Sequence, residues 1–131
     1  MAKNKPRLPF DKKGGVVAIQ RRLLASEAYL NLSPQAKALM MLLQTHWSPR
    51  GPVDYGVREA EAKIPCSRKT AMRAFKELEE AGFIVKIDES LFSSRTHSKT
   101  RTWRLTWMPC WRHREPTNDW EEISDDQSKA A

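Results

Sequence analysis

The sequence has few cysteines and no long apolar run. Cys66 and Cys110 are its 2 cysteines, and they lie far apart without a partner pattern. This usage suits a reducing cytoplasm better than a disulfide scaffold. No apolar run approaches the length of a membrane span, and the apolar residues 16–19 are too few for the core of a signal peptide. We therefore expect a cytoplasmic protein that does not associate with a membrane.

The sequence also lacks the patterns that mark enzymes and metal sites. It has only 5 glycines, and none forms a phosphate-cradling loop. No nucleophile motif is present. The histidines and cysteines show no metal-ligand spacing, because the one close pair, Cys110 and His113, has no companion pair. We therefore expect a protein that is not an enzyme and that has no cofactor, metal or small-molecule ligand.

Positive charge is what the sequence has in excess. Its 23 Lys and Arg residues outnumber 16 Asp and Glu residues, which gives a formal net charge of +7. From Glu115 onward, six acidic groups accompany one lysine, so the rest of the chain is more basic than the total implies. Nucleic acid is therefore the first partner to consider. With 40% hydrophobic residues, the 131-residue chain should form one globular domain with tails.

Charge and proline divide the chain into three parts. Residues 1–15 are basic and predict a flexible arm, which either tracks DNA or is an ordinary disordered terminus. Residues 16–109 contain the periodic segments and form the expected domain. Residues 110–131 become an acidic tail that contains Trp111 and Trp120. These tryptophans either pack on the core or are exposed as anchors for a partner.

Two helices and a short strand are predicted in the first half of the domain. Ser33 and Pro34 suit an N-cap and a first helical position. Apolar residues at helical spacing follow them, namely Ala36, Leu39, Met40, Leu43 and Trp47. After a proline-rich turn, residues 53–55 can form a short strand. Residues 57–64 form a second helix that Pro65 ends, since the residue before a proline avoids the helical region.

Residues 67–81 predict an amphipathic helix. Ser67 suits its N-cap, and Gly82 suits the left-handed position that closes a helix. The apolar and basic residues fall on opposite faces. The apolar face is Ala71, Ala74, Phe75 and Leu78, and the basic face is Lys69, Arg73 and Lys76. Only Pro65 and Cys66 separate this helix from the preceding one, so the pair predicts a helix-turn-helix.

The charge order along this helix is the reverse of what the helix dipole favours. Arg68 and Lys69 lie at the positive N-terminal end, and Glu77, Glu79 and Glu80 lie at the negative C-terminal end. An anionic partner at the N-terminal half would account for this order. A solvated helix of mixed charge accounts for it equally well, so both interpretations stay open.

Two alternating segments after Gly82 predict a β-hairpin. Their alternating apolar residues are Phe83, Val85 and Ile87 in the first segment, and Trp103, Leu105 and Trp107 in the second. The connection between them is polar, and its later part is basic, with Arg95, Lys99, Arg101 and Arg104. Such a run is usually solvated, but beside a basic helix it becomes a second contact for phosphates.

The order of parts from residue 18 to residue 107 resembles winged helix-turn-helix proteins of phages and plasmids, including the N-terminal domains of some replication initiators. The resemblance rests on LSPQAKALMMLL at 32–43, SRKTA at 67–71 and KELEEAGFI at 76–84. It implies an α+β, mainly helical fold, a winged helix-turn-helix with a C-terminal β-hairpin wing. In such proteins the helix that opens at Ser67 enters the major groove and the wing touches the DNA backbone. Pro65 stands where these turns often have a glycine.

The leading hypothesis is sequence-specific binding of double-stranded DNA by a transcription regulator or accessory replication factor of a phage, plasmid or other mobile element. We expect helix 67–81 in the major groove and the wing, residues 89–101, on the backbone. The candidate DNA-binding residues are Ser67, Arg68, Lys69, Thr70, Arg73, Lys76, Arg95, Lys99 and Arg101. A homodimer is compatible with the sequence and not required by it. The alternative is a protein-interaction winged helix that uses the acidic tail and its tryptophans.

Overall fold

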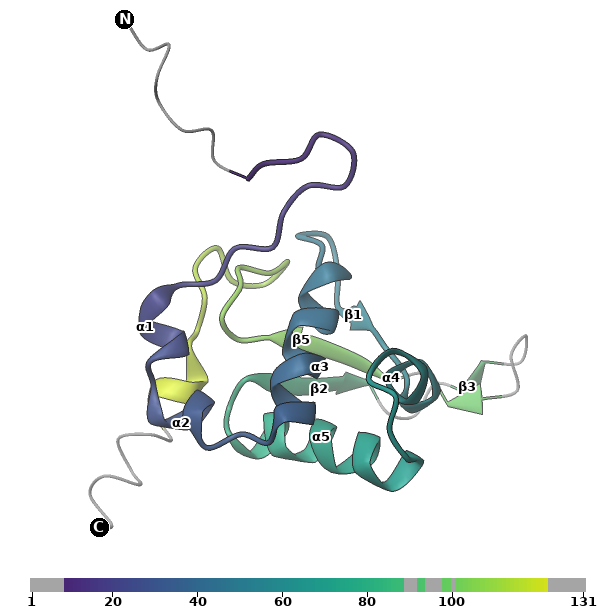
Figure 1. Ribbon diagram of the computed structural model, residues 1–131. Helices are drawn as coiled ribbons and strands as arrows, with labels where there is room; N and C mark the ends of the chain where they lie inside the picture. The colour runs from purple at the N-terminus through teal and green to yellow at the C-terminus, as the bar shows by residue number, and fades with distance from the viewer. Residues whose placement is uncertain (1–8, 89–91, 94–97, 100, 123–131) are drawn as a thin grey trace, which may run out of the picture.

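The computed structural model describes residues 9–88, 92–93, 98–99 and 101–122, and it has an α+β fold that is mainly helical (Figure 1). The helices are α1 (Arg21–Leu24), α2 (Glu27–Leu30), α3 (Pro34–Thr45), α4 (Val57–Lys63) and α5 (Arg68–Glu80). The strands are β1 (Val53–Asp54), β2 (Ile84–Asp88), β3 (Phe92–Ser93), β4 (Ser98–Lys99) and β5 (Thr102–Leu105). The α+β part of the expected fold class is confirmed. Among the described helices, none has the length and apolar character that a membrane span needs.

Three strands form an antiparallel sheet in the order β1-β5-β2, so β5 is central. Val53 of β1 and Lys86 of β2 both lie opposite Trp103 of β5, and Ile84 lies opposite Leu105. β3 and β4 pair with each other in the connection between β2 and β5. α5 packs against α3, α4 and β2, so the helices cover one face of the sheet (Figure 1).

The helix α3 begins as the sequence predicts. The Ser33 hydroxyl oxygen accepts a hydrogen bond from the Ala36 N–H at 3.1 Å, and a proline follows the cap. The apolar residues predicted for the inner face are buried, apart from Trp47. The helix ends at Thr45, so Trp47 does not lie on it, and the indole Nε1 of Trp47 donates to the Pro109 carbonyl at 2.8 Å.

A tight turn joins α4 to α5. The C-cap of α4 is Ile64, just before the proline that was expected to end the helix. Ser67 then caps α5, because its hydroxyl oxygen accepts a hydrogen bond from the Thr70 N–H at 3.1 Å. The predicted start of this helix is confirmed.

The C-terminal end of α5 closes through a Schellman motif. Gly82 has a left-handed φ of 83°. The Gly82 N–H donates to the Glu79 carbonyl at 3.2 Å, and the Phe83 N–H donates to the Leu78 carbonyl at 2.9 Å. This is the bond pattern of that motif. Phe83 therefore belongs to the cap of α5, and the strand β2 begins one residue later.

Because Phe83 belongs to this cap, the residues of β2 that face the core are not the ones that the sequence predicts. The phase of β2, meaning which alternate residues face the core, is shifted by one residue. Residues directly opposite each other on antiparallel strands lie on the same face. Ile84, which is 1% exposed, therefore shares a face with buried Leu105 and points towards the helices. Lys86 follows on that face, and Val85 and Ile87 lie half-buried on the other. The predicted alternation, with Val85 and Ile87 on the buried face, was wrong because it counted Phe83 as part of the strand.

The segment after β5 packs back onto the domain. Residues 119–122 form a helical turn, and Trp120 within it is 4% exposed. Its ring stacks on Phe83 with centroids 6.0 Å apart. The guanidinium of Arg22 in α1 lies 5.1 Å from the centroid of the Trp120 ring and pairs with Glu121. Of the two alternatives for this tryptophan, packing on the core is therefore the one that the structure has.

Arg104 differs from the other cations that the sequence groups with it. It lies opposite Val85, on the sheet face away from α5. Its guanidinium donates to Thr117 Oγ1 at 2.8 Å and lies 3.8 Å from the Asp119 carboxylate. Arg104 thus holds the C-terminal segment against the sheet, and the expectation that it belongs to a solvated or phosphate-facing run was wrong.

Glu77 of α5 caps the N-terminus of α3. Its carboxylate accepts hydrogen bonds from the Ser33 backbone N–H at 2.9 Å and from the Ser33 hydroxyl at 2.6 Å. In a capping box, the residue three positions after the N-cap supplies this carboxylate, but here that residue is Ala36. Glu77, which belongs to α5, supplies the carboxylate in place of that residue. The contact therefore joins two helices at the positive end of α3, where an anion is favoured.

We expect Glu77→Ala to lower the free energy of unfolding by about 2 kcal/mol, because the Ser33 N–H loses a charged acceptor. Urea unfolding followed by circular dichroism measures the change. Glu80→Ala is the matched control, since Glu80 lies on the same helix in an exposed pair 3.9 Å from Lys76. That pair should contribute no more than about 0.5 kcal/mol. Equal losses in the two variants would contradict the capping role.

Tyr55 places a hydroxyl group in the core. Its side chain is 1% exposed, and its ring lies 5.2 Å from His46 and 6.5 Å from Phe75. Within the described residues, its hydroxyl has no hydrogen-bond partner. Burial, and secondly the negative charge of Glu59, raise the pKa of Tyr55 above its ordinary value of 10.0.

A raised pKa means that the folded chain keeps the Tyr55 proton at a pH where the unfolded chain loses it. Stability is therefore full below about pH 10 and falls as the pH rises above it. We expect Tyr55→Phe to reduce this fall and to cost nothing at neutral pH, since it removes a buried hydroxyl without a partner. Thermal melts across this range measure both effects, and Tyr29→Phe shows what the loss of a tyrosine does in general. A steeper loss of stability at alkaline pH in Tyr55→Phe than in the parent would contradict this explanation.

Candidate nucleic-acid interface

The outer face of α5 carries a row of exposed cations. Lys69, Arg73 and Lys76 recur at i, i+4 and i+7, so they share one side of the helix, and all three are exposed. The four apolar residues predicted for the opposite side are all buried. The two faces of this helix are therefore those that the sequence predicts.

A groove of about 520 Å³ lies between α5 and the strands β2 and β5. Its cations come from both walls, namely Lys69, Arg73 and Lys76 from α5, Lys86 from β2 and Arg101 next to β5. Glu79 is the one acid among the described residues that line it. The apolar part of the lining is Met72, Phe75 and Trp103. The groove therefore combines an apolar floor with a mainly positive rim.

Aromatic stacking sets the position of the two walls. Phe75 of α5 and Trp103 of β5 stack with centroids 5.3 Å apart and planes 17° apart. The Lys86 ammonium lies 5.7 Å from the centroid of the Trp103 ring. Because Trp103 belongs to the central strand and is 1% exposed, it fixes the sheet against the helix. Lys86 and Arg101 are thereby held beside the cations of α5.

The comparison with known families agrees with this arrangement. Residues 30–84 match the model of a family described as a helix-turn-helix domain. This span contains α3, α4 and α5. The match supports a role in DNA binding, and searches of the curated proteins and of the solved structures returned no match.

The structure brings most of the candidate residues together. Those from Ser67 to Lys76 lie on α5 or at its cap, and Arg101 faces α5 across the groove. Lys99 lies in β4, but its side chain falls outside the described part of the chain. Arg95 is outside the described residues altogether. The interface that can be described therefore consists of α5, β2 and the start of β5.

The hydroxyl groups at the start of α5 are engaged with each other. Ser67 Oγ accepts from the Thr70 N–H and donates to Thr70 Oγ1 at 3.0 Å. Arg68 and Lys69, which lie between them, are exposed. The cap thus orders the first turn, and the charged side chains of that turn remain accessible to a partner.

Sequence reasoning did not assign Lys86 or Met72 to the interface. Lys86 was not among the candidate residues, although its register opposite Trp103 places it beside α5. Met72 was not assigned to either face of the helix, and it is 43% exposed. Its spacing of three residues from Lys69 is the signal that could have placed it on the outer face.

The structure also explains part of the reversed charge order along α5. Glu77 is engaged with the N-terminus of α3, so its position follows from packing and needs no anionic partner. The exposed pair of Lys76 and Glu80 contributes little. The cations of the first turn, Arg68 and Lys69, are therefore the part of the pattern that still indicates an anionic ligand.

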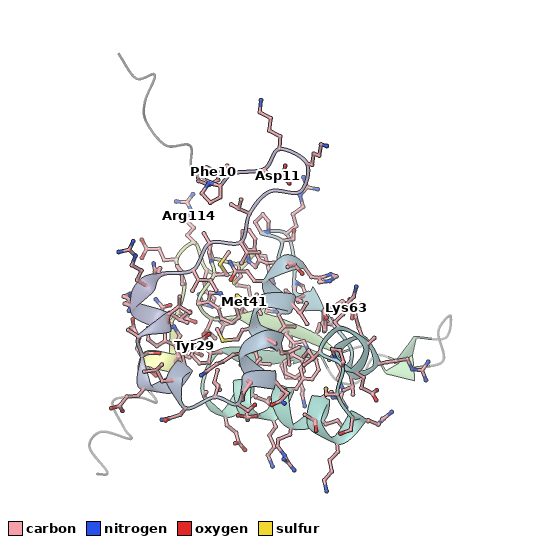
Figure 2. The ribbon with its side chains drawn as sticks, viewed as in Figure 1. Phe10, Asp11, Tyr29, Met41, Lys63 and Arg114 are labelled. Atoms are coloured by element: carbon pink, nitrogen blue, oxygen red, sulfur yellow. The ribbon has the colours of Figure 1, made fainter. Side chains whose placement is uncertain are left out.

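The described part of the N-terminal segment lies away from α5. Figure 2 shows Phe10 and Asp11 at the opposite end of the molecule from this helix. Residues 1–8 of the expected basic arm lie outside the described residues. Among the described residues, no group of three or more His, Cys, Asp or Glu could hold a metal ion.

We expect Lys69→Glu to raise the free energy of unfolding by about 0.5 kcal/mol, because it places an anion in the first turn of α5. Lys76→Glu is the matched control and should lower it slightly, because the new carboxylate lies beside Glu80. Thermal melting of the two variants and the parent measures both changes. A clear loss of stability in both would show that this face is covered by another part of the protein or by a second subunit.

Proposed function

We propose that this protein binds double-stranded DNA in a sequence-specific manner, with α5 in the major groove and residues 89–101 as a wing on the backbone. The observation that carries the proposal is the row of exposed cations on α5, which continues across the groove to Lys86 and Arg101. An α-helix fits the major groove, where base edges carry the sequence information. The helix-turn-helix match supports the same use of α5.

The proposed contacts divide into two kinds. Arg73, near the middle of the exposed face, and Lys69, in the first turn, read base edges or adjacent phosphates, with Thr70 and Lys76 beside them. Arginine can make a bidentate contact with guanine. Ser67, Arg68 and the wing cations Arg95, Lys99 and Arg101 bind the backbone, which fixes the register of the protein without reading the sequence.

The proposed role is regulation of transcription or accessory replication in a phage, plasmid or other mobile element. It rests on the resemblance of the motifs at 32–43, 67–71 and 76–84 to proteins of that kind. The protein acts by binding and not by catalysis, in the cytoplasm and without a small-molecule ligand. Mapping its binding sites on the genome that encodes it separates the two roles, because a regulator binds upstream of genes and a replication factor binds repeated origin sites.

Burial of Trp120 weakens the alternative, in which the acidic tail and its tryptophans bind a protein partner. A tryptophan that stacks on Phe83 in the core cannot also anchor a partner without unfolding part of the domain. Trp111 is half-buried, with the guanidinium of Arg112 5.8 Å from its ring centroid. DNA binding is therefore the better-supported function.

A salt titration with a matched pair of variants tests the proposal. About five phosphate-facing cations should give a slope of about −4 to −5 in a plot of log affinity against log salt. Arg73→Ala should weaken binding to a selected duplex at least about tenfold, since it costs about 1.4 kcal/mol or more. Arg21→Ala, which removes an exposed arginine of α1, should change neither quantity. A flat salt response, or no binding to any random duplex at low salt, would contradict DNA binding.

A further inference from the structure

Met72 is the one large apolar residue of α5 that the fold leaves exposed, since Phe75 and Leu78 are buried. Its side chain is 43% exposed. The other exposed large hydrophobic residues in the described part of the chain all lie before residue 31. Met72 is therefore the exposed apolar residue on a helix face whose other exposed groove-lining side chains are the cations Lys69, Arg73 and Lys76 and the acid Glu79.

The position of Met72 places it within the proposed DNA-binding surface. Lys69, Met72, Arg73 and Lys76 recur at i, i+3, i+4 and i+7, so they form one strip along the helix. All four line the groove between α5 and the hairpin strands. A ligand that reaches Lys69 and Lys76 must also pass over Met72, because Met72 lies between them on the same helix face.

The chemistry of a thioether limits what Met72 can do on that strip. It cannot neutralise a phosphate, and its sulfur is only a weak acceptor. Its long unbranched side chain can pack against an apolar group of irregular shape. On the base edges of the major groove, the apolar group is the C5-methyl of thymine.

We propose that Met72 contacts the C5-methyl group of a thymine in the DNA site and thereby helps to select the sequence. This inference rests on the proposed function and deepens it, because it assigns one base preference to one residue. Met72 supplies an apolar contact that cations cannot supply. The preferred site should contain a thymine where Met72 lies, close to the bases that Arg73 and Lys69 reach.

Removal of single methyl groups from the DNA tests this inference. A preferred duplex is first selected from a random pool, and each thymine in it is then replaced by deoxyuridine, which lacks only the C5-methyl group. At one thymine, the parent protein should bind the deoxyuridine duplex about fourfold more weakly, as expected for the loss of one buried methyl group. Thymines elsewhere in the duplex should tolerate the replacement.

Two variants of Met72 complete the test. Met72→Ala should bind the thymine and deoxyuridine duplexes equally at the sensitive position, and Met72→Gln, which keeps the length of the side chain but is polar, should do the same. Lys76→Ala is the matched control from the same strip. It should weaken binding to both duplexes and keep the fourfold difference between them.

The outcomes separate this inference from the proposed function. If the parent binds a selected duplex and no deoxyuridine replacement matters, or if the difference persists in both Met72 variants, the Met72 contact is refuted while DNA binding stands. If the parent selects no duplex at all, sequence-specific DNA binding and the Met72 contact fail together. Loss of the thymine preference in both Met72 variants, with retention in Lys76→Ala, supports the assignment.

Discussion

The carboxylate of Glu77 on the N-terminus of α3 is the contact on which the orientation of α5 depends. It accepts two hydrogen bonds from Ser33, and α3 and α5 pack along each other. Charge-assisted bonds of this kind are short and directional, so they fix how α5 is rotated against the core. With that rotation set, the apolar face of α5 is buried, and Lys69 and Arg73 point outwards. The accessibility of the candidate interface is thus a consequence of core packing.

The sheet completes the interface from the other side. Trp103 lies on β5, the strand between β1 and β2, and its buried ring stacks on Phe75 of α5. The same face of the sheet then carries Lys86, which lies in the groove. A cation on the core-facing side of a strand has a cost unless it reaches solvent or a partner. The Lys86 side chain reaches solvent through the groove, and its ammonium lies over the Trp103 ring.

The charge order along α5 is reversed at both ends of the helix, and each end has a different explanation. At the C-terminal end, Glu77 is explained by its contact with α3. At the N-terminal end, Arg68 and Lys69 oppose the helix dipole and are exposed. Charges that disfavour the isolated helix and have no structural role suit a surface for an anionic ligand. The packing of the core thus accounts for Glu77, whereas Arg68 and Lys69 are exposed and accessible to an anionic ligand.

The sequence by itself determined the starts of α3 and α5, the ends of α4 and α5, the two faces of α5 and the cations on its outer face. These features follow from interactions within a few residues, such as the caps at Ser67 and Gly82 and the 3.6-residue period. Only the tertiary structure decided the phase of β2 and the roles of Glu77 and Trp120. The roles of Glu77 and Trp120 depend on partners that are distant in sequence, as the 44-residue separation between Ser33 and Glu77 shows. The phase of β2 follows from the cap at Gly82 and Phe83 and from the pairing with β5, and a one-residue difference in where a strand begins moves its side chains to the other face.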